Sequence, residues 1–314
     1  MADTKITDLT ETSVPALDDW CETVDKSDTT DDAAGSSRKL SLNRLGGCLD
    51  PSLCNGRLTL ETGVAISTSD QTGKTSVYFT PYFGNRISVF DGTRWKLYSF
   101  TELTLALGTL TSGKNYDVFI YDNSGTLTLE LSAAWSSDTA RTDALTTQDG
   151  IYVKSGATTR RYLGTIRTTS TTATEDSAQK RFLWNAYNRV NRIILKADAT
   201  YHNYTTTSWR AYNNDSTNNI QWVRGLALEP MVLTVSGAIQ STASAYIGIS
   251  AEDDAGTNWD AESPAVSTSN NTILETSYQF RTFPGIGYHL RTLIEFGGSG
   301  ATQFDATLFG IFIG

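Results

Sequence analysis

The chain is poor in the side chains that most often carry catalysis or hold a metal. Its 314 residues include only two histidines, His202 and His289, and three cysteines. No Gly-x-Ser-x-Gly motif accompanies either histidine, so a catalytic triad is not expected. Ligation of a metal by histidine needs clustered side chains, and these two lie far apart in the sequence. We therefore expect no catalytic residue, no cofactor and no metal site.

Long apolar runs are missing as well. No stretch approaches the ~18 consecutive apolar residues of a membrane-spanning helix, and the N-terminus has no apolar signal-peptide core. This predicts synthesis in a cytosol-like compartment and no insertion into a membrane. Cys21, Cys48 and Cys54 cannot all pair within one chain, and reduced thiols are the simpler interpretation in such a compartment. A late disulfide between Cys48 and Cys54 is the alternative.

Basic residues are too few for a nucleic-acid partner. The formal net charge is −9 and the isoelectric point is near 4.8, whereas binding to phosphates draws most of its affinity from Lys and Arg. Most of the negative charge lies in residues 1–34, which hold ten acidic and two basic side chains. No binding to nucleic acid is expected.

This acidic leader also carries widely spaced apolar residues, which are too few to build a core of their own. They need another surface, which is typical of a segment that becomes ordered on a partner. We predict that residues 1–47 form an extended anchoring segment, ended by a break at Gly46-Gly47. The predicted anchoring residues are Ile6, Leu9, Val14, Leu17, Trp20, Leu40 and Leu42.

The rest of the chain has the composition of β-structure. It is rich in threonine and in aromatic residues, which favour strands, and the whole chain has only six prolines. Short apolar runs alternate with turn signals such as Asp91-Gly92, which is typical of a tight hairpin. We predict an all-β protein, with a β-rich middle domain over residues 48–170 and a distal β-sandwich or jelly-roll domain over residues 171–314.

Three shorter segments have patterns of their own. Residues 136–147 favour a helix, because two alanines and a leucine fall at helical spacing there. Residues 168–174 are a Thr/Ser run, whose composition is typical of a linker. Residues 180–192 alternate between two sets of side chains, and we predict a strand rather than a helix.

The last residues of the sequence are unusually apolar. Residues 306–314 form a nearly continuous apolar strand, and a strand that is apolar on both faces must be buried on both faces. The simplest second cover is another copy of the chain around a symmetry axis. We predict a homotrimer interface made of Leu308, Phe309, Ile311, Phe312 and Ile313.

Aromatic side chains and one arginine gather in the loops of the last third. Tyr, Trp and Arg are enriched at contact hot spots, although a buried packing cluster is equally consistent with the sequence. The candidate contact residues are Tyr201, Tyr204, Trp209, Arg210 and Trp259. Four acidic residues surround the last of these and could supply the two carboxylates of a glycoside hydrolase, but a solvated acidic loop is the simpler interpretation. They are Asp253, Asp254, Asp260 and Glu262.

The leader Met1-Ala-Asp-Thr-Lys-Ile, with its acidic stretch and the run Arg38-Lys39-Leu40-Ser41-Leu42, resembles the N-terminal segment of tailed-bacteriophage appendage proteins. Residues 78–95, 113–119 and 152–156 are similar to a module of phage structural proteins. The last third is similar in general pattern to the trimeric jelly-roll heads that end such appendages.

The resemblance implies a virion structural protein that is synthesised in the host cytoplasm. It implies a homotrimeric tail fibre or receptor-binding appendage, docked on other virion proteins through its leader. The distal loops would then contact a glycan or protein of the host surface. A head fibre or capsid decoration protein is the alternative. A glycan-cleaving depolymerase ranks third, because such enzymes usually have a long repetitive β-helix, and no repeat is visible here.

Overall fold

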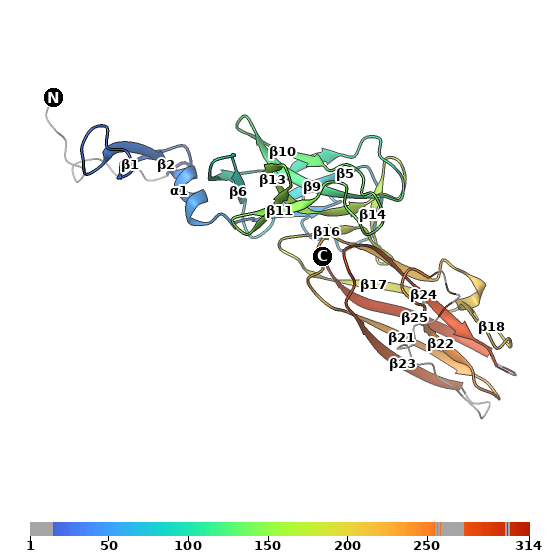
Figure 1. The fold of residues 1–314 in the computed structure, drawn as a ribbon. Helices are drawn as coiled ribbons and strands as arrows, with labels where there is room; N and C mark the ends of the chain where they lie inside the picture. Colours follow the sequence, from blue (N-terminus) through green and yellow to red (C-terminus); the bar gives the residue numbers. More distant parts are fainter. Residues whose placement is uncertain (1–14, 255, 257, 259–272, 299, 301) are drawn as a thin grey trace.

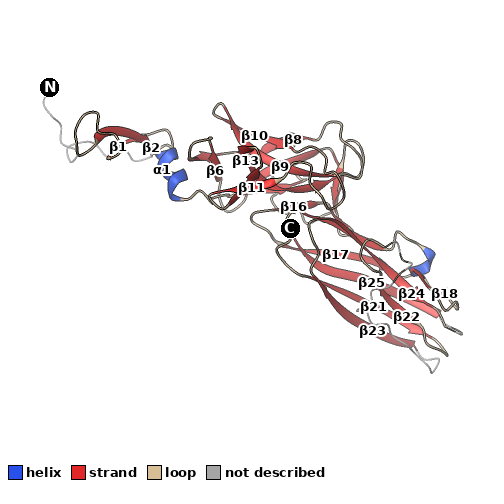
Figure 2. Ribbon diagram, viewed as in Figure 1, coloured by secondary structure: helices blue, strands red, loops and turns tan. Residues whose placement is uncertain are grey.

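The computed structural model describes residues 15–254, 256, 258, 273–298, 300 and 302–314. Within these residues the regular secondary structure is nearly all strand, with a single α-helix and a short 3-10 helix (Figure 2). The predicted all-β class is confirmed. Three parts follow one another along the molecule (Figure 1): a hairpin arm (residues 15–41), a middle part (residues 42–170) and a distal part (residues 171–314).

The arm is an antiparallel hairpin of β1 (Trp20–Asp25) and β2 (Ser36–Ser41), which runs directly into α1 (Leu42–Leu49). The predicted break at Gly46-Gly47 is wrong, because both glycines lie inside α1. A Cβ atom on Gly47 would come within 2.6 Å of the backbone of Trp95. Glycine therefore lets α1 lie directly against β7 (Trp95–Ser99), and the pair joins the arm to the body instead of separating them.

The middle part is built around an antiparallel sheet in the order β10-β9-β13-β12-β11, with β16 also paired to β13. A three-stranded sheet β3-β5-β8 and the hairpin β6-β7 complete it. The strands of the larger sheet are β9 (Asn115–Asn123), β10 (Thr126–Leu131), β11 (Leu145–Gln148), β12 (Ile151–Lys154), β13 (Ala157–Arg167) and β16 (Leu183–Asn185). The others are β3 (Gly56–Thr59), β5 (Ser76–Pro81), β6 (Arg86–Phe90) and β8 (Leu103–Ala106).

The distal part is a sandwich of two sheets. One sheet, which we call the terminal sheet, has the order β17-β25-β21-β23, with β18 also on β25. The other has the order β19-β24-β20-β15-β14-β4, with β22 also on β24. Leu233 and Leu308 of the terminal sheet pack in one core with Trp222 and Ile247 of the other sheet.

The strands of the terminal sheet are β17 (Asn191–Asp198), β18 (His202–Asn203), β21 (Met231–Gln240), β23 (Ile273–Thr282) and β25 (Thr302–Ile313). Those of the second sheet are β4 (Gln71–Lys74), β14 (Thr174–Asp176), β15 (Lys180–Arg181), β19 (Trp209–Ala211), β20 (Asn219–Arg224), β22 (Tyr246–Ile249) and β24 (Gly287–Phe296). The short helix η2 (Tyr212–Asn214) lies between β19 and β20.

Two of the shorter predictions are wrong, and one holds in part. Residues 136–147 form a loop and the start of β11, because Ser, Thr and Asp side chains there bond to nearby backbone groups, as Thr142 does to the Ala134 carbonyl. Residues 168–174 form a tight turn closed by a bond from Thr169 N to Ala173 O (2.8 Å), not a linker. Residues 180–192 hold the short strands β15 and β16.

The chain after this turn rejoins strands that precede it. β14 pairs with β4, and β16 pairs with β13. The middle and distal parts therefore share sheets across residue 170, which is the boundary predicted from the sequence.

Candidate functional site

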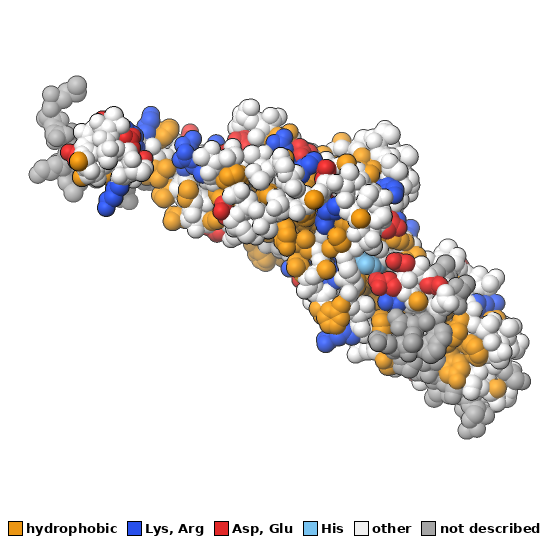
Figure 3. Space-filling model, viewed as in Figure 1, with side chains coloured by type: hydrophobic (Ala, Val, Ile, Leu, Met, Phe, Trp, Pro, Cys, Tyr) orange, Lys and Arg blue, Asp and Glu red, His pale blue; other side chains and the backbone are white. Residues whose placement is uncertain are grey.

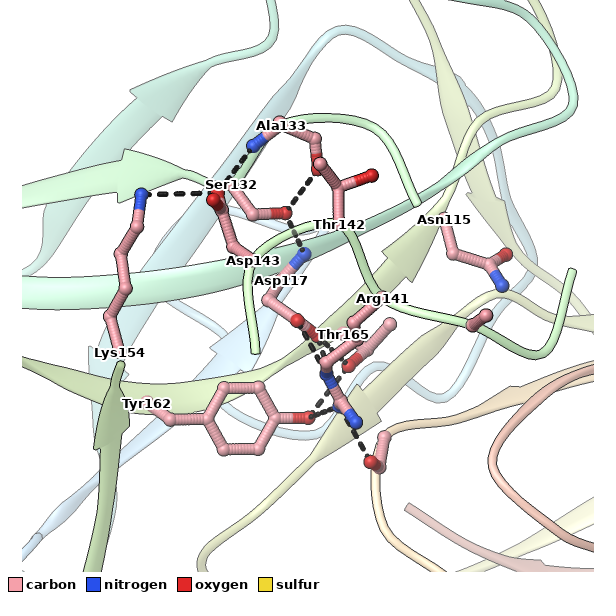
Figure 4. Close-up of polar contacts among 12 residues, drawn as sticks. Asn115, Asp117, Ser132, Ala133, Arg141, Thr142, Asp143, Lys154, Tyr162 and Thr165 are labelled. Carbon is pink, nitrogen blue, oxygen red and sulfur yellow. Dashed lines mark hydrogen bonds and ion pairs between the residues drawn. The ribbon is translucent and has the colours of Figure 1, made fainter. Parts of the chain in front are cut away.

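A buried ionic cluster joins the middle part to the distal part (Figure 4). Arg141 Nε lies 2.6 Å from Oδ2 of the fully buried Asp117, and Arg141 Nη2 donates a 2.6 Å hydrogen bond to the carbonyl of Gly225, after β20. Thr165 donates a further hydrogen bond to Asp117 (2.7 Å). Burial raises the pKa of the Asp117 carboxyl group, and the hydrogen bonds from Arg141 and Thr165 oppose this. The cluster ties β9 and β13 to the distal sandwich.

A second arginine, which is buried, strengthens the same joint. Arg57, on β3, donates hydrogen bonds of 2.6 Å to the carbonyl oxygens of Asn188 and Gly314. Burial lowers the pKa of its guanidinium to about 10. Gly314, directly after β25, thus lies against the middle part, where Figure 1 marks the C-terminus. Arg57 is buried, the Arg141 side chain is 10% exposed, and both guanidinium groups bond to backbone carbonyls across the joint, so this joint is suited to holding the two parts together.

A buried carboxylate organises the loops at the end farthest from the arm. Glu295, on β24, is fully buried and accepts hydrogen bonds from Arg210 Nε (2.7 Å) and from the backbone N–H of Asn213 (3.1 Å). It also lies 2.7 Å from Nε2 of His202, on β18. Burial opposes the charge of His202, but the hydrogen bond with Glu295 raises its pKa above the ordinary 6.5.

The predicted contact residues are placed differently from one another. Tyr201 is 63% exposed, whereas Tyr204 is buried and carries the Arg210 guanidinium 3.7 Å from its ring centre. Trp209 is half-buried on β19. Trp259 lies outside the described residues. Tyr201 and Trp209 thus have surface to offer to a partner, while Tyr204 and Arg210 mainly hold the loops together.

Trp209 belongs to an aromatic row that the sequence did not reveal. Trp209, Phe296 and Tyr246 occupy paired positions on β19, β24 and β22. The Phe296 ring centre lies 5.5 Å from each of the other two, and all three side chains are half-buried. Pairing of this kind could have been expected only if the register of the three strands had been known.

The terminal strand β25 has one covered face and one open face. Leu308 and Phe312 are buried in the sandwich core, whereas Phe309 and Ile311 are 37% and 53% exposed. Ile313 is half-buried. On the neighbouring strands, Ile193 (64% exposed) and Val232 are both paired with Ile311. We call Ile193, Val232, Phe309 and Ile311 the outer stripe.

The predicted anchoring residues are only partly described. Ile6, Leu9 and Val14 lie outside the described residues. Trp20 is 61% exposed on β1, with the Lys39 ammonium 4.4 Å from its ring centre. The remaining three, Leu17, Leu40 and Leu42, are half-buried.

Where the acidic loop is described, its side chains accept hydrogen bonds from backbone N–H groups of the loop itself and of β24. Asp254 Oδ1 accepts a hydrogen bond from Gly256 N, and Asp253 Oδ1 accepts one from Leu290 N. Asp260 and Glu262 lie outside the described residues. Among the residues that are described, no group of three or more His, Cys, Asp or Glu side chains is placed to hold a metal ion.

Two further findings concern the thiols and the helices. Cys21, Cys48 and Cys54 are free thiols. In the described parts of the chain, no helix has the length and apolar character needed to cross a membrane.

Comparison with known proteins finds only weak structural similarity. No protein-family model and no curated protein matches the chain. An insecticidal delta-endotoxin from Bacillus thuringiensis is 7% identical with a TM-score of 0.23, covering 83% of this chain and 52% of that one. The infectious bursal disease virus VP2 subviral particle is 12% identical with a TM-score of 0.28, covering 85% and 77%. The chain thus spans about half the length of the endotoxin, and similarity at this level carries no argument about function.

Proposed function

We propose that the chain is a structural protein of a bacteriophage virion, a homotrimeric tail fibre or receptor-binding appendage without enzymatic activity. The observation that carries this proposal is the layout of the molecule, with an arm at one end and a loop cluster at the other (Figure 1). Arg57 and Arg141 fix the middle part to the distal part between these two ends. Such a layout suits a protein that docks at one end and makes contact at the other.

The arm is the proposed docking element. It leaves large apolar side chains in solvent, with Trp20 61% and Val24 58% exposed. A two-stranded hairpin is marginally stable by itself, so burial of these side chains against another protein would stabilise it. We propose that this partner is another virion protein of the tail or the capsid.

The outer stripe is the proposed trimer contact. Its side chains form a continuous apolar surface across three strands, and apolar patches of this kind mark sites of association. Three copies around one axis would cover the face of β25 that the chain itself leaves open.

The distal loops are the proposed contact with a host-surface glycan or protein. Tyr201 is exposed there, and Trp209 offers part of its ring beside Phe296 and Tyr246. Aromatic side chains give contact area at low entropic cost, and three copies would add avidity to weak single sites.

The docking role is tested by removing residues 2–41 and keeping α1. The body should unfold at an unchanged temperature, because the arm contributes nothing to the buried core clusters, while incorporation into particles is lost. Trp20→Ser should also weaken incorporation. The control is Leu49→Ser, which removes an exposed apolar side chain from α1 (76% exposed). Normal incorporation of the deletion variant would refute the proposal.

The alternative, a head fibre or capsid decoration protein, differs in where the arm docks. A low-resolution image of the particle decides between tail and capsid. A trimer that decorates particles but binds no host surface would favour the capsid location.

A further inference from the structure

The two strands of the arm leave both of their outer edges open. Within the described residues, β1 and β2 pair with each other and with no third strand. Leu42 N donates to Asp19 O (2.9 Å), and Trp20 is paired with Ser41. In an antiparallel ladder, hydrogen-bonded and non-hydrogen-bonded pairs alternate.

The alternation determines which backbone groups face the partner strand and which face outward. Cys21 and Thr23 bond inward to β2, so the N–H and C=O groups of Trp20, Glu22 and Val24 point away from the hairpin. By the same alternation, Ser37, Lys39 and Ser41 present theirs on the outer edge of β2. In the described part of the arm, each copy therefore offers two unpaired strand edges, on which the outward carbonyl of Ser37 already accepts a hydrogen bond from Arg38 Nη1 (2.9 Å).

The two edges carry opposite charge. β1 contains Glu22 and Asp25 and no base, whereas β2 contains Arg38 and Lys39 and no acid. Arg38 is already paired with two aspartates of the loop that joins the strands, so Lys39 is the base that β2 can offer to a neighbouring copy. Acidic and basic side chains of the arm are visible in Figure 3. Pairing β1 with β1, or β2 with β2, would set like charges opposite one another, which is unfavourable. Pairing β1 of one copy with β2 of the next would set opposite charges together.

We propose that the arms of neighbouring copies pair head to tail, with β1 of one copy on β2 of the next. A head-to-tail contact uses both edges of every copy and closes when the copies are related by a rotation axis. With the three copies of the proposed function, on which this inference rests, the arms form one closed antiparallel sheet at the docking end. Trp20 and Val24 of all copies are then gathered on a single ordered surface.

The test is amide hydrogen exchange of the full chain at a concentration at which it sediments as a trimer. The edge-directed amides of Trp20, Glu22 and Val24 should exchange at least ~100-fold more slowly than in an unfolded chain. Glu22→Pro removes a donor from the outer edge and none from inside the hairpin, so it should remove this protection. Glu22→Thr keeps the donor and is the matched control.

The outcomes separate this inference from the proposed function. Unprotected edge amides in an intact trimer would overturn the pairing of arms and leave the trimer standing. A monomer at micromolar concentration would refute the trimer itself. Protection that arises only after incorporation into particles would assign the edges to another virion protein, which also overturns the inference. The wild-type measurement decides these cases even if Glu22→Pro fails to form its hairpin.

Discussion

The outer stripe allows a quantitative prediction about assembly. Ile193 and Ile311 are 64% and 53% exposed and are paired on neighbouring strands. Complete burial of an isoleucine side chain is worth about 1.5–3 kcal/mol, so covering the exposed half of each is worth ~1 kcal/mol. Over two residues in three copies, the double variant Ile193→Thr/Ile311→Thr should lose ~6 kcal/mol of association free energy. Threonine keeps the β-branched shape that suits a strand.

The assay is sedimentation equilibrium over a range of concentrations. The wild-type protein should sediment at about 103 kDa, three times the 34.2 kDa chain. A loss of ~6 kcal/mol raises the trimer dissociation constant about 10⁴-fold. That constant has the dimension of concentration squared, so the concentration at half-assembly should rise about 100-fold.

The control lies on the inner face of the same strand. Leu308 is fully buried in the sandwich core, so Leu308→Ala should lower the free energy of unfolding of each chain by about 2–5 kcal/mol. The stripe variant should leave the unfolding of the dissociated chain nearly unchanged. A wild-type mass of 34.2 kDa at micromolar concentration, or a trimer that the stripe variant does not weaken, would show that copies of the chain do not cover this face.

Three further predictions concern the joints of the molecule. Gly47→Ala should cost about 1–3 kcal/mol of unfolding free energy in denaturant titrations, because the added Cβ would come within 2.6 Å of backbone atoms. Gly46→Ala should cost less, because its Cβ would contact a leucine side chain, which can move. Asp117→Asn should cost about 3–5 kcal/mol because it leaves a buried guanidinium without its charge partner, whereas Asp143→Asn, in a half-exposed ion pair, should cost less than ~1 kcal/mol. His202 has a raised pKa, so its stabilising effect is complete below pH ~6.5 and is lost as the pH rises through the raised value. The difference in unfolding free energy between wild type and His202→Gln should therefore shrink from pH ~5.5 to pH ~8.5. A constant difference would contradict the reasoning.

Local patterns predicted the hairpins because local geometry decides them. The Asp91-Gly92 turn does connect β6 and β7, and Gly92 has the positive φ (100°) that a tight turn needs. The helix expected at 136–147 fails because local side-chain bonds to the backbone compete with it and because contacts far along the chain hold this part of the chain in a loop. Arg141 is drawn to Asp117 on β9 and to Gly225. Nothing within the segment indicates either partner.

In the candidate site, too, the sequence indicated the residues but not the long-range contacts that place them. Tyr204 and Arg210 were predicted as contact residues for a partner, and in the structure they contact each other. What brings them together is Glu295, which lies 85 positions from Arg210 and pairs with it across β19 and β24. A lone acid in an apolar strand was the available signal, but the sequence does not say which loop it faces.

Backbone carbonyls account for most of what the sequence could not show. Arg161 is fully buried and donates hydrogen bonds to the carbonyls of Pro51, Leu53 and Ser88, which fixes the segment that follows α1 to β13 and β6. Arg57 holds the end of β25 in the same way. A guanidinium has five donors in a rigid fork, so it can satisfy several buried carbonyls of irregular backbone at once. Every residue has a backbone carbonyl, so the residue type does not indicate which carbonyl an arginine will bond. These arginines hold the segment after α1 to the middle part and the middle part to the distal sandwich, so the connections on both sides of the middle part are fixed by buried hydrogen bonds.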